Sequence, residues 1–503
     1  MGQDDLGFAF SFASPRAARR RDDDQPLRIL ALANLSGRGA GEHAEPLDER
    51  KAMAVDVDNL ERVFARLAPR LVFPLKSDAN PGGTLEIQFG NPEDFHPDRL
   101  WRSPAFADLR ALRAELQNPA TWERAAAALG VTPAATPSPP TADEKEAAAD
   151  DIQRLLGRAP TAEPPQHGAA AQVQRLLQDI VAPHIVRDTS NLRQPLIAAL
   201  DEAISARMRA ILHAPAFQAL QAAWRGVGKL VSGLELGETL QLTLLDVSRE
   251  ELAADVAAAG GDLSRCALYP ILCGAAMAAP DDVPWSLIVA DFSFGPDADD
   301  LALLAALGAL GTAAGAPVLA GAKPGLIGCH GGDELANPAA WQPPDHDSAT
   351  RWRTLRRSAT APWIGLAMPR ILGRLPYGAK HDPVEAFAFE EMAADSTHED
   401  FLWIIPAWDL ALMAGQAFAE EGWDYDLTGR LNIAELPSYV TRDDEGVAHQ
   451  QPCAEVLMPE AAGEAILAQG IMAILSYRNR DAARLLRWQS VAEPLQPLAG
   501  LPS

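Results

Sequence analysis

The chain has 503 residues and a formal net charge of −25. This length predicts about two or three domains. A chain this acidic excludes a general nucleic-acid binder, which needs basic side chains to displace counterions, and it argues against docking on an anionic membrane. The four cysteines are scattered without a CxxC pair, so we expect buried thiols in a reducing cytoplasm and neither a disulfide framework nor a zinc site.

Apolar periodicity after the charged start predicts a small α/β unit. The pattern indicates a buried strand at 27–35, an amphipathic helix at 56–70, a half-exposed strand at 83–91 and then another helix. Asp56 or Asp58 is expected to cap the first helix, because a short carboxylate side chain can accept a hydrogen bond from a free main-chain N–H. Strand and helix alternate here as they do in α/β domains.

The segment from residue 191 onward continues this alternation on a larger scale. Two helices meet at a break over 213–215, and a strand at 239–247 leads into a helix for which Ser248 and Glu251 have capping-box spacing. The run 301–322 contains no charge and is long enough to span a bilayer. Because it is rich in alanine and glycine and a proline interrupts it, we expect a core helix, a turn and a short buried strand instead.

The middle of the chain differs in composition from both ends. It contains proline, alanine and acidic residues without apolar periodicity, and such a segment cannot bury enough surface to fold alone. We therefore predict an α/β (α+β) protein with a small and a large mixed domain. The expected units are a disordered N-terminus at 1–26, a small domain at 27–120, a Pro/Ala-rich linker with short helices at 121–188, a large domain at 189–490 and a tail at 491–503.

Two short segments resemble a phosphate-binding loop and a catalytic or metal site, but neither has the spacing of a known motif. The turn with Gly37, Gly39 and Gly41 follows a strand. It matches neither GxGxxG nor a GK[ST] loop, and no helix starts directly after it, so a plain turn is favoured. Cys329 and His330 are sequence neighbours that cannot usually face each other, and too few further ligands surround them for a metal. We expect no catalytic residue, cofactor or metal.

The run 370–391 concentrates arginines, glutamates, a tyrosine and a histidine in one short stretch. Prolines and glycines break any long helix there, so the charges are distributed over turns and do not share one face. Loops held by salt bridges explain this mixture without catalysis. We expect Arg374 to pair with Glu390 and Glu391 in a partly buried position.

The same run resembles a signature of the large subunit of the type VI secretion contractile sheath, the TssC or VipB family. Members carry a proline–arginine–hydrophobic run, then RLPYG, then a DPVE-type segment that ends in F–FEE. Further blocks between 196 and 479 agree in order, including a WRG block and the strand "WSLIVADFSFG". The resemblance marks the following residues as a structural signature: Trp224, Arg225, Gly226, Asp291, Pro369, Arg370, Arg374, Pro376, Tyr377, Gly378, Pro383, Glu385, Phe387, Glu390 and Glu391.

The front of the chain resembles the small sheath subunit, the TssB or VipA family. "ILALANLSGR" is similar to that family's first strand and turn, and "LDERKAMAVDVDNLERVFARLAPRLVFPL" is similar to its next block. The chain therefore resembles a natural fusion of the two subunits, and we expect its halves to pack as one body. Family large subunits continue beyond the point that corresponds to Ser503, so the resemblance also implies a shortened large subunit that does not build a contractile tube by itself.

The resemblance implies a structural role in the contractile assembly that drives effector translocation in type VI secretion. The implied partners are other sheath subunits, the inner tube, the baseplate and the disassembly ATPase, with no nucleic acid and no direct membrane insertion. The implied location is the cytoplasm. Two alternatives remain open: a non-polymerising adaptor or cap on ordinary sheath subunits and, more remotely, an enzyme built on an α/β fold.

Overall fold

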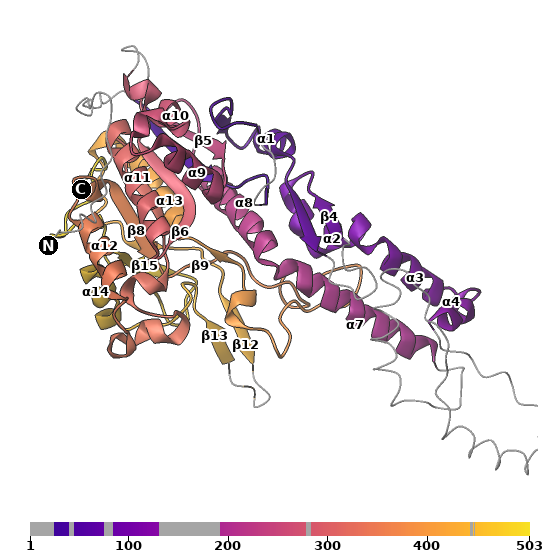
Figure 1. Cartoon of the computed structure of the whole chain (residues 1–503). Helices are drawn as coiled ribbons and strands as arrows, with labels where there is room; N and C mark the ends of the chain where they lie inside the picture. The colour runs from indigo at the N-terminus through magenta and orange to yellow at the C-terminus, as the bar shows by residue number, and fades with distance from the viewer. Residues whose placement is uncertain are drawn as a thin grey trace, which may run out of the picture.

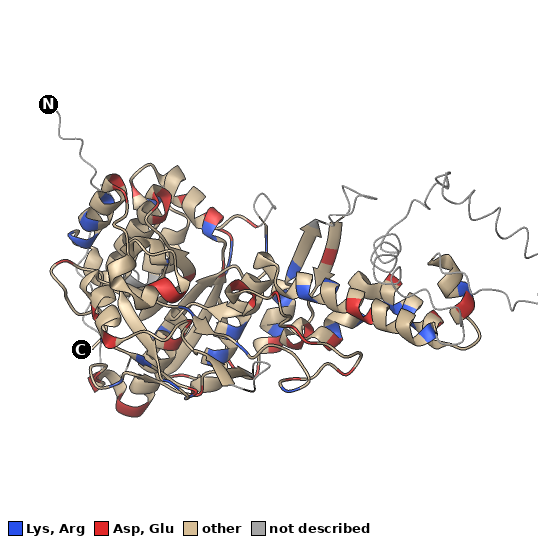
Figure 2. Ribbon diagram, turned by 90° about the horizontal axis from the view of Figure 1, so that it is seen from below, with Lys and Arg blue, Asp and Glu red and all other residues tan. Residues whose placement is uncertain are grey.

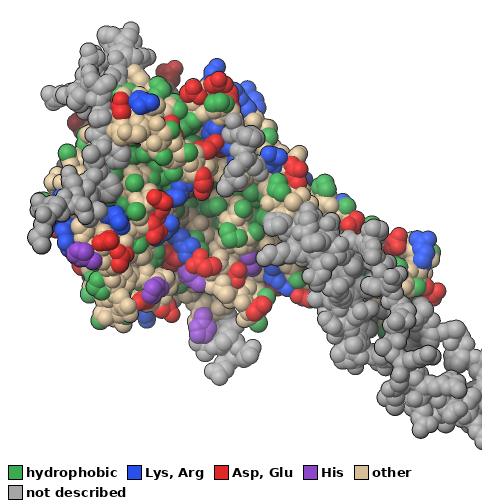
Figure 3. Space-filling view, viewed as in Figure 1, with side chains coloured by type: hydrophobic (Ala, Val, Ile, Leu, Met, Phe, Trp, Pro, Cys, Tyr) green, Lys and Arg blue, Asp and Glu red, His purple; other side chains and the backbone are tan. Residues whose placement is uncertain are grey.

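A computed structural model shows a broad body from which a narrower arm extends (Figure 1). The structure describes residues 25–39, 45–74, 84–129, 192–277, 283–442, 446 and 448–502. The predicted disordered start and nearly all of the predicted linker lie outside these ranges. Acidic and basic side chains are interspersed along the body and the arm (Figures 2 and 3).

The body is built on a nine-stranded sheet. Its strands are β1 (Leu27–Ala33), β2 (Met53–Val55), β5 (Leu240–Asp246), β6 (Leu287–Phe294), β7 (Val318–Ala322), β8 (Ile364–Met368), β11 (Asn432–Ile433), β14 (Met472–Ser476) and β15 (Ala483–Leu485). They lie in the order β11-β15-β14-β8-β7-β6-β1-β5-β2. The six strands from β14 to β5 run parallel, and the strands at both margins pair antiparallel. The predicted α/β class is confirmed.

The first strand of the chain lies inside this sheet. β1 pairs in parallel with β5 along its whole length, Leu27–Ala33 beside Leu240–Asp246. On its other edge Ile29–Leu32 pairs with Leu287–Ala290 of β6. Both faces of β1 are buried, which explains why its sequence is a continuous apolar run instead of an alternating one. β1 therefore lies inside a sheet whose other strands, apart from β2, all come from residues 240–485.

Helices cover both faces of the sheet, so the body has three layers with a separate apolar core on each side. One face carries α9 (Arg249–Ala259), α10 (Leu268–Met277), α11 (Ala298–Ala314), α12 (His346–Arg356) and α14 (Glu460–Ala468), and the other carries α8 (Pro215–Gly233) and α13 (Ala407–Glu421). Alternate residues of β1 point into different cores. Leu27 and Ile29 belong to the core beneath α8 and α13, and Leu30 and Leu32 belong to the core beneath α9 and α11.

The arm is helical, and the described segments before residue 130 and after residue 191 both contribute to it. α7 (Arg193–Leu212) runs out from α8, and α3 (Ala107–Gln117) and α4 (Trp122–Ala128) lie beside it (Figure 1). α2 (Pro97–Arg102) precedes them, and α1 (Leu60–Leu67) follows β2. Three small two-stranded sheets complete the structure: β3 (Arg70–Pro74) with β4 (Thr84–Gln88), β9 (Ile371–Leu372) with β10 (Trp403–Ile404), and β12 (Tyr439–Arg442) with β13 (Ala448–Gln451).

Several predicted elements are confirmed at their predicted places. Ser248 caps α9 in a capping box with Glu251. The uncharged run 301–322 forms most of α11, a turn and β7, and none of the helices in the described ranges is long and apolar enough to cross a membrane. The predicted cap of α1 is wrong: Asn59 occupies that position, and Asp56 instead accepts hydrogen bonds in the turn before it.

Candidate functional site: polar networks that join the two segments

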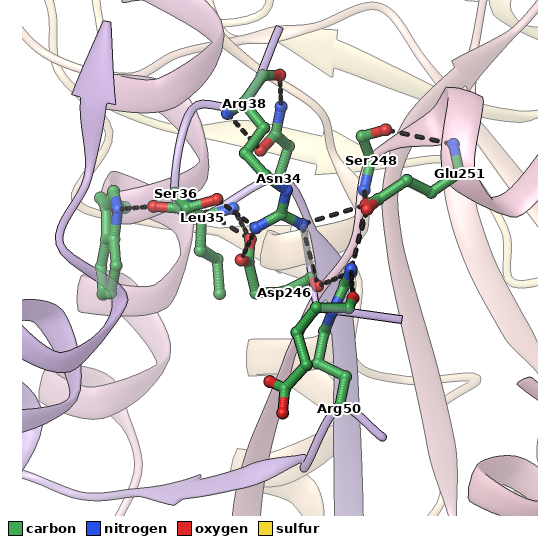
Figure 4. A network of polar contacts seen from close by, with 10 residues as sticks. Asn34, Leu35, Ser36, Arg38, Arg50, Asp246, Ser248 and Glu251 are labelled. Atoms are coloured by element: carbon green, nitrogen blue, oxygen red, sulfur yellow. Dashed lines mark hydrogen bonds and ion pairs between the residues drawn. The ribbon is translucent and has the colours of Figure 1, made fainter. Parts of the chain in front are cut away.

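The turn after β1 is held by a buried carboxylate at the end of β5. Oδ1 of Asp246 accepts hydrogen bonds from the main-chain N–H groups of Leu35 at 2.8 Å and Ser36 at 3.1 Å. Its Oδ2 forms an ion pair with Arg38 of the same turn. β1 and β5 are neighbours in the sheet, so their carboxyl ends bring these groups together (Figure 4).

A second carboxylate joins this network from the first turn of α9. Nη2 of Arg38 lies 3.0 Å from Glu251. Arg50 reaches both oxygens of Glu251, at 2.8 and 3.1 Å. Burial alone would raise the pKa of Glu251, but hydrogen bonds from Arg50, Ser248 and Arg38 together lower it to about 2. Glu251 is therefore ionised at neutral pH and holds two arginines of the front segment (Figure 4).

The WRG block lies on α8, against the same turn. The indole N–H of Trp224 donates to the carbonyl of Leu35 at 2.8 Å, and the Trp224 ring packs against Phe64 of α1 with ring centroids 4.4 Å apart. Gly226 faces α13 so closely that a Cβ there would lie 2.4 Å from the ring of Trp408. Arg225 is exposed. Two of the three residues of the block thus have packing roles.

The run 370–391 contains a buried ion pair. Arg374 donates to both oxygens of Glu391, at 2.6 and 2.8 Å, and their side chains are only 5% and 1% exposed. Gln221 accepts from Arg374 at 3.3 Å. The main-chain N–H of Tyr377 donates to Glu391 at 2.7 Å, and the Arg374 guanidinium lies 4.1 Å from the centre of the Tyr377 ring. The predicted pairing with Glu391 is confirmed.

The predicted pairing of Arg374 with Glu390 is wrong. The Glu390 carboxylate points the other way and accepts from the main-chain N–H of Ala379 at 3.0 Å. Consecutive residues in an extended chain project to opposite sides, so only one of the two glutamates can face Arg374. A Cβ on Gly378 would lie 2.2 Å from Oε2 of Glu390, so a larger residue there would displace the Glu390 carboxylate.

Arg370 forms a second, less buried network. It donates to both oxygens of Glu399, at 3.0 and 2.9 Å, and to Glu455 through its side chain and main-chain N–H groups. His398 lies 3.1 Å from Glu455. Burial would raise the pKa of Glu455, but hydrogen bonding to His398 and the charge of Arg370 lower it. These contacts join Arg370 to Glu399 and Glu455, which lie on two different later segments of the chain.

The remaining signature residues differ in burial, and two of them contact the part of the chain before residue 130. Pro369 and Pro376 are buried, and Pro383 and Glu385 are exposed. The main-chain N–H groups of Glu385 and Ala386 donate to Asp98, which precedes the arm. The rings of Phe387 and Trp101 lie 5.4 Å apart, Phe387 packs on Phe389, and the half-buried Asp291 of β6 accepts from the indole of Trp408 at 2.8 Å.

Cys329 and His330 form ordinary contacts with neighbouring protein groups. Glu334 accepts from the main-chain N–H of His330 at 2.8 Å and contacts the Cys329 thiol, while Lys323 pairs with Asp300 at 2.9 Å. Over the described ranges, the structure contains no group of three or more His, Cys, Asp or Glu side chains that could hold a metal.

Comparison with known protein families decides the family. The model of the VipB tail sheath N-terminal domain, also called EvpB, matches residues 194–492. The chain belongs to the VipB sheath family. The model of the type VI secretion system VipA family matches residues 15–122. The type VI secretion system sheath protein TssC1 of Pseudomonas aeruginosa is 30% identical over 320 residues, which cover 62% of this chain and 64% of TssC1. The chain thus spans less than two thirds of the length of this relative.

The polar networks occupy different places relative to these matches. Asp246 and Glu251 belong to the VipB match, and Arg38 and Arg50 belong to the VipA match, so the first network crosses between them. The pair of Arg374 with Glu391 lies wholly inside the VipB match. We name the first network the junction network.

Sequence reasoning missed the four charged residues of the junction network. Glu251 was recognised only as a capping residue, and Arg38 only as part of a glycine-rich turn. Their pairing joins residues about 200 positions apart, and no spacing rule connects such positions. One signal was available: Asp246 is the polar residue that ends a buried apolar strand, a position where parallel strands often place functional groups.

Proposed function

We propose that this chain is a fused sheath subunit, a structural component of the contractile assembly of a type VI secretion apparatus. One observation carries the proposal: β1, from the VipA match, lies between β5 and β6 of the VipB match as an inner strand of one sheet. An inner strand is bonded on both edges, so the two segments act as one subunit in one polypeptide.

The proposed units are a small segment at 27–120 and a large segment at 189–490, joined through 121–188, with an N-terminal extension at 1–26 and a tail at 491–503. Residues 491–502 pack on the body, where Val491 and Ala492 are buried. In this reading the signature residues hold the large segment together. We assign them no catalytic step, because their described partners are other side chains and main-chain groups of the same fold.

The proposed partners follow from the sheath families. They are other sheath subunits, as further copies of this chain or as separate VipA-type and VipB-type subunits, and then the inner tube, baseplate and disassembly ATPase. Sheath contacts of this kind are heterologous and build open helical arrays. The four cysteines are free and buried, and burial raises the pKa of Cys266 and Cys273 to about 12, so these thiols are poorly reactive. The cytoplasmic location is proposed from the sheath families, and unpaired cysteines agree with it.

Electron microscopy of the purified chain tests this function. The chain is imaged alone and after mixing with a VipA-type and VipB-type pair that forms sheaths. Sheaths that carry the chain, as shown by a gold label on an added terminal tag, are expected from the mixture. Binding only to the ends of such sheaths would indicate the adaptor or cap instead. A chain that stays monomeric and unassociated in both experiments would contradict a sheath role.

A further inference from the structure

A groove runs between the last strand of the sheet and the first helix of the chain. β2 pairs with β5 on one edge, and no strand in the described ranges pairs with its other edge. The groove between β2 and α1 is open to the surface and has a volume of about 610 Å³. A neighbouring hollow of about 560 Å³ shares Lys51, Met53 and Arg66 with it. We call the two together the β2–α1 groove.

The β2–α1 groove is strongly basic, although the chain carries a net charge of −25. Its charged lining residues are Arg38, Arg50, Lys51, Arg62, Arg66, Arg70, Glu45 and Asp246. Arg38 and Arg50 are neutralised within the junction network. Lys51, Arg62 and Arg66 are exposed and form no ion pair with any residue in the described ranges. Three cations are thus available to a partner.

The groove also offers apolar contact and main-chain hydrogen bonding. Met53, Val63, Ala52 and Ala54 line it together with the cations. A strand with a free edge can accept another extended segment, whose side chains then point alternately into and away from the groove. Unpaired edges are otherwise protected by charge or cover, because they promote aggregation.

We propose that the β2–α1 groove is a docking site for an extended acidic segment of a partner protein. The segment adds beside β2, and its carboxylates meet Lys51, Arg62 and Arg66. Opposite charge selects the segment and speeds its approach, while main-chain bonds along β2 fix its register. This inference stands apart from the sheath assignment, because it depends only on the shape and charge of the groove.

Binding of model peptides to the full chain tests the proposal. The probe is a fluorescein-labelled decapeptide of alternating glutamate and valine, measured by fluorescence anisotropy. Reversing Lys51→Glu, Arg62→Glu and Arg66→Glu together is expected to weaken binding about tenfold or more. The matched control reverses three exposed arginines elsewhere, Arg99→Glu, Arg102→Glu and Arg124→Glu. It has the same net charge and is expected to bind as the original chain does.

Further probes separate the charge from the strand. The same decapeptide with proline in place of valine keeps the carboxylates but loses half of its main-chain donors, so it is expected to bind more weakly. Equal binding of the proline peptide, or of inorganic polyphosphate, would overturn docking of an extended peptide. Equal loss of binding in both reversal variants, or no loss in either, would contradict the β2–α1 groove as the binding site of the peptide. Unfolding midpoints of the variants show that each is folded.

Discussion

Arg374 and Glu391 form a bidentate ion pair in the interior of the large segment, with N–O distances of 2.6 and 2.8 Å. A buried pair of this kind need not stabilise a protein more than apolar residues of the same shape would. Removing one partner is different, because it leaves the other charge buried and unpaired. The pair therefore gives a direct test of whether the run 370–391 is structural.

Replacing Arg374 by alanine is expected to lower the free energy of unfolding by about 3–5 kcal/mol. The matched control is Arg430→Ala, whose pair with Glu420 and Glu421 is at the surface and should change stability by only about 0.5 kcal/mol. Urea denaturation measures both. An unfolding free energy for Arg374→Ala equal to that of the control would contradict buried pairing and reopen a functional reading of the run.

Two glycines of α8 give a second test. A Cβ on Gly226 would lie 2.4 Å from Trp408, whereas a Cβ on Gly228 would meet nothing within 4 Å. Gly226→Ala is therefore expected to destabilise the chain by about 1–3 kcal/mol. Gly228→Ala should be neutral or stabilise it by up to about 1 kcal/mol, because alanine favours a helix. Thermal unfolding compares them, and equal midpoints would show that α8 and α13 are not packed this closely.

Sequence patterns predicted the local elements well, because local periodicity, prolines and capping residues determine them. The break between α7 and α8, the capping box of Ser248 and the helix within 301–322 are examples. The position of β1 between β5 and β6 was not predictable from periodicity. It depends on pairing between strands more than 200 residues apart, and a continuous apolar strand fits any inner position of a parallel sheet.

Side-chain pairing was predictable only in part, for the same reason. The composition of 370–391 indicated salt bridges, but not that Glu391 would face Arg374 while Glu390 turned away. The junction network was missed because Arg38 and Glu251 are distant in sequence. These residues meet because β1 and β5 are neighbouring parallel strands, so the turn after β1 lies beside the start of α9.

The junction network predicts a specific acid dependence of stability. The pKa of Glu251 falls from its ordinary 4.5 to about 2 in the folded chain. A carboxylate with a lowered pKa contributes stability above about pH 4.5, and this contribution is lost as the pH falls toward about 2. Replacing Glu251 by glutamine should remove about 1–3 kcal/mol at neutral pH and flatten the loss over that range. Unfolding free energies measured at several pH values test this, and identical pH profiles would contradict the network.

Asp291 is expected to change the stability of the chain with pH in the opposite direction. Burial raises its pKa from 3.8 to about 6, although the hydrogen bond from Trp408 partly offsets the effect. A raised pKa lowers stability as the pH rises through about 6, because the ionised form is disfavoured in the folded state. Asp291→Asn keeps an acceptor for Trp408 and should stabilise the chain above pH 6, by about 1–3 kcal/mol. Destabilisation above pH 6 would contradict this account and show that the ionised carboxylate is favourable in the folded chain.

The central claim is that the VipA and VipB matches fold as one unit through β1. Hydrogen–deuterium exchange of the intact chain, followed by mass spectrometry, measures it most directly. Main-chain amides in the inner strands of a sheet exchange only through extensive unfolding. The account predicts that peptides covering Leu27–Ala33 exchange as slowly as those covering Leu240–Asp246 and Leu287–Phe294. Fast exchange of Leu27–Ala33 beside protected β5 and β6 would contradict it.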